Sequence, residues 1–144
     1  MGSGSASRGD RAGCEFLNVR YLLDTTFLID HLRGETAAAA RMTRFFADGD
    51  VLMVNEVVIC EAATGAPAHP DPDLAALLEP MEFIQPAAEA AVTAGRWRAE
   101  ARARGQSLSL ADSLIAAAAD VAGATVLTRN VRDFRLTPVP VEDY

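Results

Sequence analysis

The sequence contains no lysine: all 13 of its basic residues are arginine, set against 20 acidic residues and a formal net charge of −7. Proteins that bind nucleic-acid phosphates usually carry a basic surface, so this excess of acidic residues counts against nucleic-acid binding. The objection weakens where several carboxylates surround a cation, because the bound ion inverts the local field. A coding bias toward Arg and Ala accounts for the missing lysine, so composition alone leaves the binding partner open.

Cysteine and histidine are scarce, at two residues each. Cys14 and Cys60 occur in no CxxC or Cys/His spacing. Only His31 and His69 could join them, so zinc ligation is not expected. We expect Cys14 to be a thiol in a flexible tail and Cys60 a small buried hydrophobe, in a reducing cytoplasm. No apolar run approaches the ~18 residues that a membrane span needs, and no secretory signal core is present, which predicts a soluble cytoplasmic protein.

What the sequence does contain is enough apolar material for one domain. Half of its 144 residues are hydrophobic and the charged fraction is ordinary, which favours a globular fold over disorder. Residues 1–19 are rich in Gly, Ser and Arg and show no hydrophobic period. We interpret them as a mobile extension, in part a scar of expression cloning. Residues 20–144 are expected to form the folded domain.

Short apolar runs alternate with helical stretches along that domain. We expect strands at 20–23, 51–54, 81–84, 124–128 and, on a sheet edge because of flanking prolines, 139–141. We expect helices between residues 25 and 34, at 36–47, between 55 and 65, from 71 or 73 to 78, from 86 to about 104, and from 110 to about 122. Thr25 or Thr26 is expected to cap the first helix, Asn55 the third and Ser109 the last. This alternation predicts an α/β sandwich with a mainly parallel sheet flanked by helices.

Five polar residues stand out against this apolar background. In an open parallel sheet, active sites form beyond the carboxyl ends of the strands. Asp24 closes the first expected strand, and Asn130 follows the fourth, with Asp133 shortly after it. Glu61 in VVICEAA and Asp112 in SLADSLIAAAA interrupt apolar helical runs, where an unpaired buried charge is costly. Together they predict a shared acidic pocket, and hard oxygen ligands without His or Cys favour Mg²⁺ or Mn²⁺.

Each of these residues also has an ordinary structural explanation. Asp24 could cap the first helix, and Asp112 has a capping-box spacing that places its charge near a helix N-terminus. Asn130 and Asp133 could be turn residues. Glu61 is harder to explain in this way, because it is expected in mid-helix between apolar neighbours. The hypothesis of a shared site therefore rests on their co-occurrence.

We expect most other notable side chains to be structural. Asp30 and His31 are placed on the solvated side of the first helix, and Phe46 is placed with the apolar residues of the second. The arginines of residues 96–104 are read as a solvated face. Trp97 on that helix is expected in the core or in an interface rather than as a stacking platform for bases.

Three segments resemble a known family of nucleases. YLLDTTFLIDHLRG, at residues 21–34, resembles the opening motif of PIN-domain nucleases, specifically the VapC-type toxins of prokaryotic toxin–antitoxin pairs. VVICEAATG is similar to their second motif, a Glu followed four residues later by Gly. SLADSLIAAAADVAGATVLTRNVRDF resembles their most distinctive segment, an Asp-bearing helix, a strand and a TRN-x-x-DF turn, and PVPVEDY matches the usual end of such chains. The resemblance runs from about Tyr21 to Tyr144.

The resemblance implies a PIN fold, a three-layer sandwich with a small, mainly parallel sheet, and RNA cleavage that depends on Mg²⁺ or Mn²⁺. Asp24 and Asp112 would be the principal metal ligands, and Glu61 would ligate metal or position the attacking water. The fourth acid of many relatives falls eighteen residues after the third, and Asn130 occupies that place here. Asp133 is the candidate to supply the missing carboxylate. This departure favours one metal ion over two.

The resemblance also assigns supporting residues and partners. Thr25 and Thr128 are expected to support the acidic cluster by hydrogen bonds, and Arg129, with Arg132, to meet the RNA phosphate at its rim. The implied chemistry is metal-assisted hydrolysis of an RNA phosphodiester bond. Such toxins are held inactive by a small antitoxin protein and commonly form homodimers, so both are expected partners.

Two alternatives remain open at this point. One is a binding module with an inert acidic pocket, in which Asn130 marks the lost activity. The other is a phosphoaspartyl protein with Asp24 as nucleophile. A phosphatase of the haloacid-dehalogenase type requires a second Asp at the position of Thr26, and the absence of that Asp counts against this alternative.

Overall fold

The computed structural model describes residues 4–5, 8–9 and 18–144, and its centre is a sheet of five parallel strands. The strand order is β5 (Glu82–Ile84), β4 (Val51–Asn55), β3 (Arg20–Leu23), β6 (Thr125–Leu127) and β7 (Val141–Glu142). The predicted parallel α/β architecture is confirmed, and the last strand lies at an edge as expected. Near the N-terminus, β1 (Gly4–Ser5) and β2 (Arg8–Gly9) pair antiparallel. Cys14 and most of the expected mobile extension lie outside the described residues.

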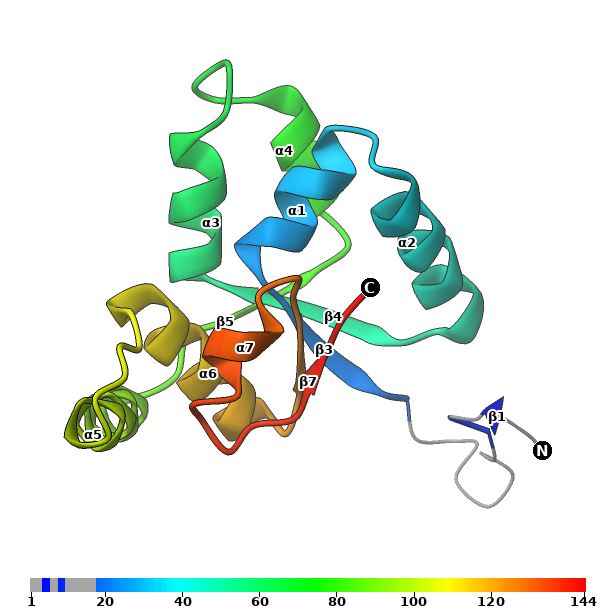
Figure 1. Ribbon diagram of the computed structural model, residues 1–144. Coiled ribbons are helices and arrows are strands. Elements are labelled where there is room, and N and C mark those ends of the chain that lie inside the picture. Colours follow the sequence, from blue (N-terminus) through cyan, green and yellow to red (C-terminus); the bar gives the residue numbers. More distant parts are fainter. Residues whose placement is uncertain (1–3, 6–7, 10–17) are drawn as a thin grey trace.

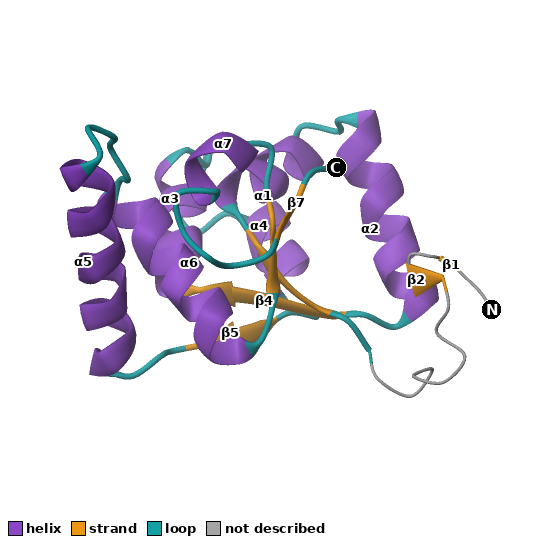
Figure 2. Cartoon of the chain, turned by 60° about the horizontal axis from the view of Figure 1, so that its bottom comes forward, coloured by secondary structure: helices purple, strands orange, loops and turns teal. Residues whose placement is uncertain are grey.

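Helices connect the strands and cover the sheet. They are α1 (Thr25–Leu32), α2 (Thr36–Asp48), α3 (Glu56–Thr64), α4 (Pro72–Leu78), α5 (Ala88–Ala103), α6 (Leu110–Ala122) and α7 (Val131–Phe134). Figure 1 shows α1, α2 and α4 above the sheet and α5 and α6 below it, so the sheet is the middle layer of the sandwich. Figure 2 shows α5 packed alongside α6 at one end of the sheet and α2 at the other.

Most helix ends follow the expected local chemistry. The Asn55 side chain accepts a hydrogen bond of 3.0 Å from the Val58 amide, and Ser109 accepts one of 3.0 Å from the Asp112 amide, so both predicted N-caps are confirmed. The predicted threonine cap of α1 is wrong. Asp24 occupies the N-cap position, and its side chain makes no capping hydrogen bond. Its carboxylate is instead engaged by the hydroxyls of Thr26 and Thr128, as described below.

The core lies between the sheet and the helices on both faces. Its largest fully buried side chains include Phe27, Phe45 and Phe134. Trp97 is 4% exposed, which confirms its assignment to the core. Two burial predictions are wrong: the side chain of Phe46 is 60% exposed, and Cys60 is exposed. Phe46 directly follows the buried Phe45, and Cys60 lies between the half-buried Ile59 and the exposed Glu61; helical periodicity turns both to the outer side.

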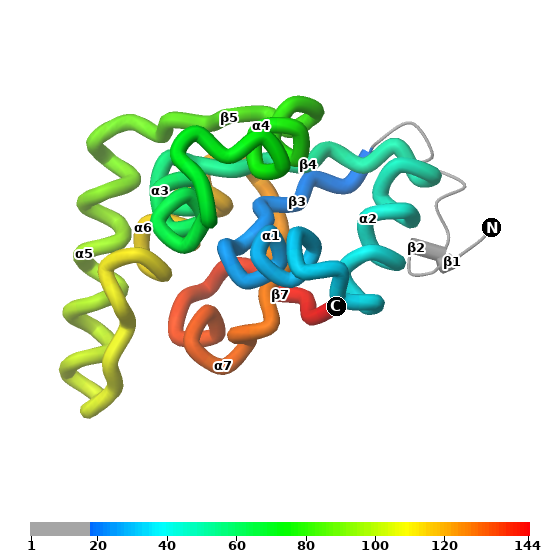
Figure 3. The backbone as a smooth tube through the Cα atoms, turned by 90° about the horizontal axis from the view of Figure 1, so that it is seen from above, coloured from blue at the N-terminus to red at the C-terminus, as the bar shows by residue number. Residues whose placement is uncertain are grey.

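The chain after β7 returns to the helices above the sheet. Seen from above, its end lies beside α1 and α2, with α7 on the other side of β7 (Figure 3). Helix α7 was not predicted, since four residues give too short a pattern to read. Among the described residues, no helix is long and apolar enough to span a membrane.

Candidate active site

Asp24 is the buried centre of the site. It follows β3, and its amide donates to the carbonyl of Leu127 at 3.0 Å, so it sits where β3 and β6 end together. Its side chain is almost fully enclosed, at 4% exposure. Oδ2 accepts hydrogen bonds from the hydroxyls of Thr128, at 2.7 Å, and Thr26, at 3.1 Å. Two hydroxyl donors thus fix the orientation of this carboxylate.

Asn130 joins two further acids at the same edge of the sheet. Its Nδ2 lies 2.9 Å from Oδ2 of Asp133 and 3.4 Å from Oδ2 of Asp112. Its backbone amide donates to the Thr128 hydroxyl at 2.8 Å. The structure therefore brings Asp112, on the first turn of α6, together with Asp133 on α7. A neutral amide therefore stands between the two carboxylates.

Glu61 approaches from helix α3 and is the most exposed of the four acids. Its Oε1 accepts a hydrogen bond of 2.7 Å from the hydroxyl of Thr25, the first residue of α1. The apolar sequence around Glu61 predicts a buried or paired charge, and the structure gives a solvent-exposed carboxylate held by one hydroxyl. Thr25 thus supports Glu61, as Thr26 and Thr128 support Asp24.

Two acids of the cluster, Asp24 and Asp112, have raised pKa values. Burial raises the pKa of Asp24, and the nearby Glu61 charge adds to this effect, while the hydroxyl bonds of Thr128 and Thr26 oppose it. Burial, followed by the charges of Asp24, Asp133 and Glu61, raises the pKa of Asp112 to about 6. Burial and the neighbouring like charges are therefore the causes that raise both pKa values.

The donor chemistry of the cluster fits a hard divalent cation. Among the described residues, no three Asp, Glu, His or Cys side chains converge closely enough to hold an ion as they stand. The available donors are carboxylate oxygens, which Mg²⁺ and Mn²⁺ prefer. Their mutual repulsion is the kind that a cation relieves. The residues that could hold such a cation are Asp24, Glu61, Asp112 and Asp133.

Arg129 lies at the rim of the site but is already paired. Its backbone amide donates to the Thr26 hydroxyl at 3.3 Å, and its guanidinium forms a 2.8 Å ion pair with Asp30. The Tyr144 hydroxyl donates to the same carboxylate. The prediction that Asp30 is a plain solvated residue of α1 is therefore wrong. No sequence signal links Asp30 to Tyr144, which lies 114 residues further along the chain.

Comparisons with known proteins agree with this geometry. Residues 21–139 match the PIN domain family. Over 117 residues the chain is 33% identical to Ribonuclease VapC19 of Mycobacterium tuberculosis, covering 81% of this chain and 94% of that protein.

Solved structures show the same fold. VapBC2 from Rickettsia felis, bound to a DNA fragment from its promoter, matches with a TM-score of 0.75 and 20% identity, covering 88% of this chain and 99% of that one. VapBC-1 from nontypeable Haemophilus influenzae matches with a TM-score of 0.73 and 21% identity, covering 87% and 98%. The family match, the VapC relative and the shared fold agree over almost the same residues, and the chain belongs to the PIN domain family, among its VapC-type members.

Proposed function

We propose that this chain is a metal-dependent endoribonuclease that hydrolyses RNA phosphodiester bonds as the toxin of a VapBC-type toxin–antitoxin pair. The observation that carries the proposal is the acidic cluster at the carboxyl edge of the sheet, where the hydroxyls of Thr26 and Thr128 hold the buried Asp24 and the Asn130 amide joins Asp112 to Asp133. The similarity to Ribonuclease VapC19 supports RNA as the substrate.

Each acid has a distinct role in this proposal. Asp24 and Asp112 hold Mg²⁺ or Mn²⁺, which when bound would activate water and offset the charge that develops on the phosphate. Thr26 and Thr128 orient Asp24 through their hydroxyls. Glu61, the exposed acid, positions the attacking water and accepts its proton.

Asn130 favours a single metal ion. Its amide donates toward both Asp112 and Asp133, so each carboxylate has one oxygen engaged by a hydrogen bond. An amide in place of a carboxylate removes one negative charge from the position where a second ion would bind. Asp133 then acts mainly by holding Asn130 and by adding to the negative potential of the site.

The proposed partners follow from the relatives and from one surface feature. The similar solved structures include VapBC2 and VapBC-1, and we propose a cognate antitoxin as the partner of this chain. An apolar pocket of about 430 Å³ lies between α1, α2 and α4 and includes the exposed Phe46 and Leu32. Exposed apolar pockets of this kind are typical of protein-binding surfaces. A homodimer and a cytoplasmic location, with access to RNA, complete the proposal.

Cleavage assays with matched variants test the enzyme proposal. Purified protein is incubated with RNA and Mn²⁺, with and without EDTA. We expect wild-type cleavage to stop on chelation and to fall by about 100-fold or more in Asp24→Asn and Asp112→Asn, the order lost with key electrostatic groups. Asp120→Asn changes an exposed acid at the other end of α6 and should retain full activity. Unchanged cleavage in both site variants contradicts the proposal, and a wild type that cleaves no RNA favours the inert binding module.

A further inference from the structure

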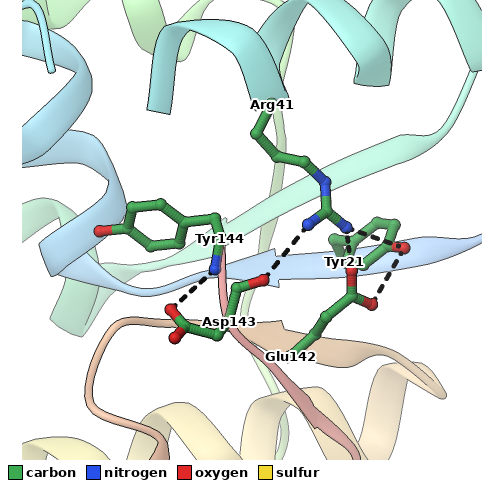
Figure 4. Close-up of polar contacts among 5 residues, drawn as sticks. All are labelled: Tyr21, Arg41, Glu142, Asp143 and Tyr144. Carbon is green, nitrogen blue, oxygen red and sulfur yellow. Dashed lines mark hydrogen bonds and ion pairs between the residues drawn. The ribbon is translucent and has the colours of Figure 1, made fainter. Parts of the chain in front are cut away.

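Arg41 on α2 clamps the C-terminal segment, residues 141–144. Its side chain is only 8% exposed, and it forms an ion pair with Glu142. Nη1 donates to the backbone carbonyl of Asp143 at 3.3 Å, and Nη2 donates to the Tyr21 hydroxyl at 3.3 Å. Figure 4 shows the guanidinium reaching from α2 down to these groups. Its central carbon also lies 4.9 Å from the ring centre of Phe45, within cation–π range.

Arg41 adds to the backbone bonds that attach this segment to the sheet. Strand β7 has two residues, and β6 bonds it through the amide of Val126 to the carbonyl of Pro140, at 2.9 Å, and the amide of Thr128 to the carbonyl of Glu142, at 3.0 Å. These bonds hold one side of the segment, and Arg41 holds the other. A guanidinium removed from water requires such complete pairing, and here its partners lie on the segment that it fixes.

Tyr144, the last residue of this segment, lies at the rim of the acidic site. The ring of Tyr144 packs edge-to-face on Phe27, with centroids 5.0 Å apart and planes at 88°. Its hydroxyl donates to Oδ2 of Asp30, the same oxygen that pairs with Arg129 at 2.8 Å. The Arg129 guanidinium also lies over the Tyr144 ring, 5.4 Å from its centre. Arg129 is therefore held by a carboxylate and by a ring face.

The contacts with Asp30 and Tyr144 determine the orientation of the Arg129 side chain. Its backbone amide bonds to Thr26, whose hydroxyl bonds to Asp24, so Thr26 links the residue to the acidic cluster. A guanidinium released at this position would be drawn to the carboxylates of the cluster. With the hold in place, the Arg129 side chain stays 52% exposed, and the donors that do not face Asp30 can meet a phosphate.

We propose that Tyr144 is a positioning residue that, together with Asp30, holds Arg129 outward to contact the RNA phosphate, and that Arg41 acts through it by fixing residues 141–144. This inference rests on the proposed ribonuclease function for its substrate. It assigns no chemistry to Tyr144 itself. The role of Tyr144 is instead to keep the side chain of Arg129 in an orientation that can bind substrate. Arg129 is the arginine whose backbone amide bonds to Thr26.

A double-mutant cycle tests the coupling. Tyr144→Phe removes the hydroxyl and keeps the ring on Phe27. With single-stranded RNA and Mn²⁺, we expect it to raise KM about 3- to 10-fold while kcat stays within about twofold, because substrate binding is weakened without loss of chemistry. Arg129→Ala should raise KM at least as much. The double variant should be no worse than Arg129→Ala alone, since coupled residues are non-additive. Additive effects, or an unchanged KM in Tyr144→Phe, overturn the proposal.

A readout without catalysis separates this inference from the proposed function. The ¹⁵N-labelled arginine Nε–H signal of Arg129 is identified by its loss in Arg129→Lys. We expect Tyr144→Phe to shift this signal and Arg41→Met to shift it likewise, and Arg41→Met to speed hydrogen exchange at residues 136–144 by about tenfold or more. Arg44→Met, an exposed arginine on the same helix, should do neither. If the wild type cleaves no RNA, the proposed ribonuclease function is refuted. If the Arg129 signal does not shift in Tyr144→Phe, the positioning role of Tyr144 is refuted.

Discussion

The hydroxyl of Thr128 lies 2.7 Å from Oδ2 of Asp24, and this hydrogen bond joins the ends of two neighbouring strands. Because β3 and β6 are parallel and pair Leu23 with Leu127, the residues that follow each strand meet at one edge of the sheet. Thr128 is fully buried, and its amide in turn bonds to Glu142 on β7. The orientation of the central acid is therefore set by three strands together.

Removing the Thr128 hydroxyl should weaken the site without disturbing its shape. Thr128→Val deletes the donor and keeps a β-branched side chain. We expect Mn²⁺-dependent cleavage to fall about 10- to 100-fold, the range typical of residues that orient a metal ligand. Thr128→Ser, which keeps the hydroxyl, should recover most of the activity. Thr125→Val, a matched change at the start of β6, should leave cleavage intact, and equal losses in Thr125→Val and Thr128→Val would count against a specific role.

Restoring a fourth acid tests the one-metal proposal. Asn130→Asp places a new charge beside Asp112 and Asp133 and removes the amide that now bridges them. In EDTA we expect the melting temperature to drop by about 2–5 °C, because carboxylates close together repel. Mn²⁺ should then raise it more than it raises the wild type. A variant that melts like the wild type in both conditions would show that position 130 lies outside the metal site.

The raised pKa of Asp112 predicts a pH-dependent stability of the metal-free protein. The folded-state pKa is about 6 against an ordinary 3.8, so the folded state binds the proton more tightly than the unfolded chain. The stability from this group is complete below about pH 4 and is lost as pH rises through about 6. In EDTA, Asp112→Asn should match the wild type at about pH 4 and melt higher near pH 7.5. A difference in melting temperature that is flat with pH contradicts the assigned shift.

The Arg41–Glu142 ion pair predicts that removing Arg41 alone destabilises the protein more than removing both charges. Arg41→Met leaves the Glu142 carboxylate without its partner in a half-exposed position, and we expect a loss of about 1–3 kcal/mol in the free energy of unfolding. Adding Glu142→Gln should recover part of this loss, because the unpaired charge is then gone. Chemical denaturation of the two variants measures the difference. A double variant less stable than Arg41→Met would contradict this account.

The sequence predicts the fold well because each element has local determinants. The apolar run before Asp24 indicates a strand, the Ser109 and Asn55 caps begin their helices, and each prediction depends on residues within one turn. The positions of Asp24 and Thr128 at the sheet edge follow from the same local reading, since parallel strands place their ends together.

What the sequence does not predict is pairing between distant segments. Asp30 has the pattern of a solvated helix residue, yet its partners Arg129 and Tyr144 come from the last part of the chain. Arg41 lies in an Ala-rich helix and is buried only because Glu142 and two aromatic rings meet it from other elements. Such contacts depend on how helices and strand ends pack, which no spacing in the sequence encodes.

The most direct test of the central claim is a crystal structure of the protein grown with Mn²⁺, with anomalous diffraction locating the ion. We expect one anomalous peak between Asp24 and Asp112, with Glu61 or Asp133 turned toward it, and the peak absent in Asp24→Asn. Strong Mn²⁺ peaks elsewhere, with none at these two carboxylates, would contradict the account of this cluster as the catalytic metal site.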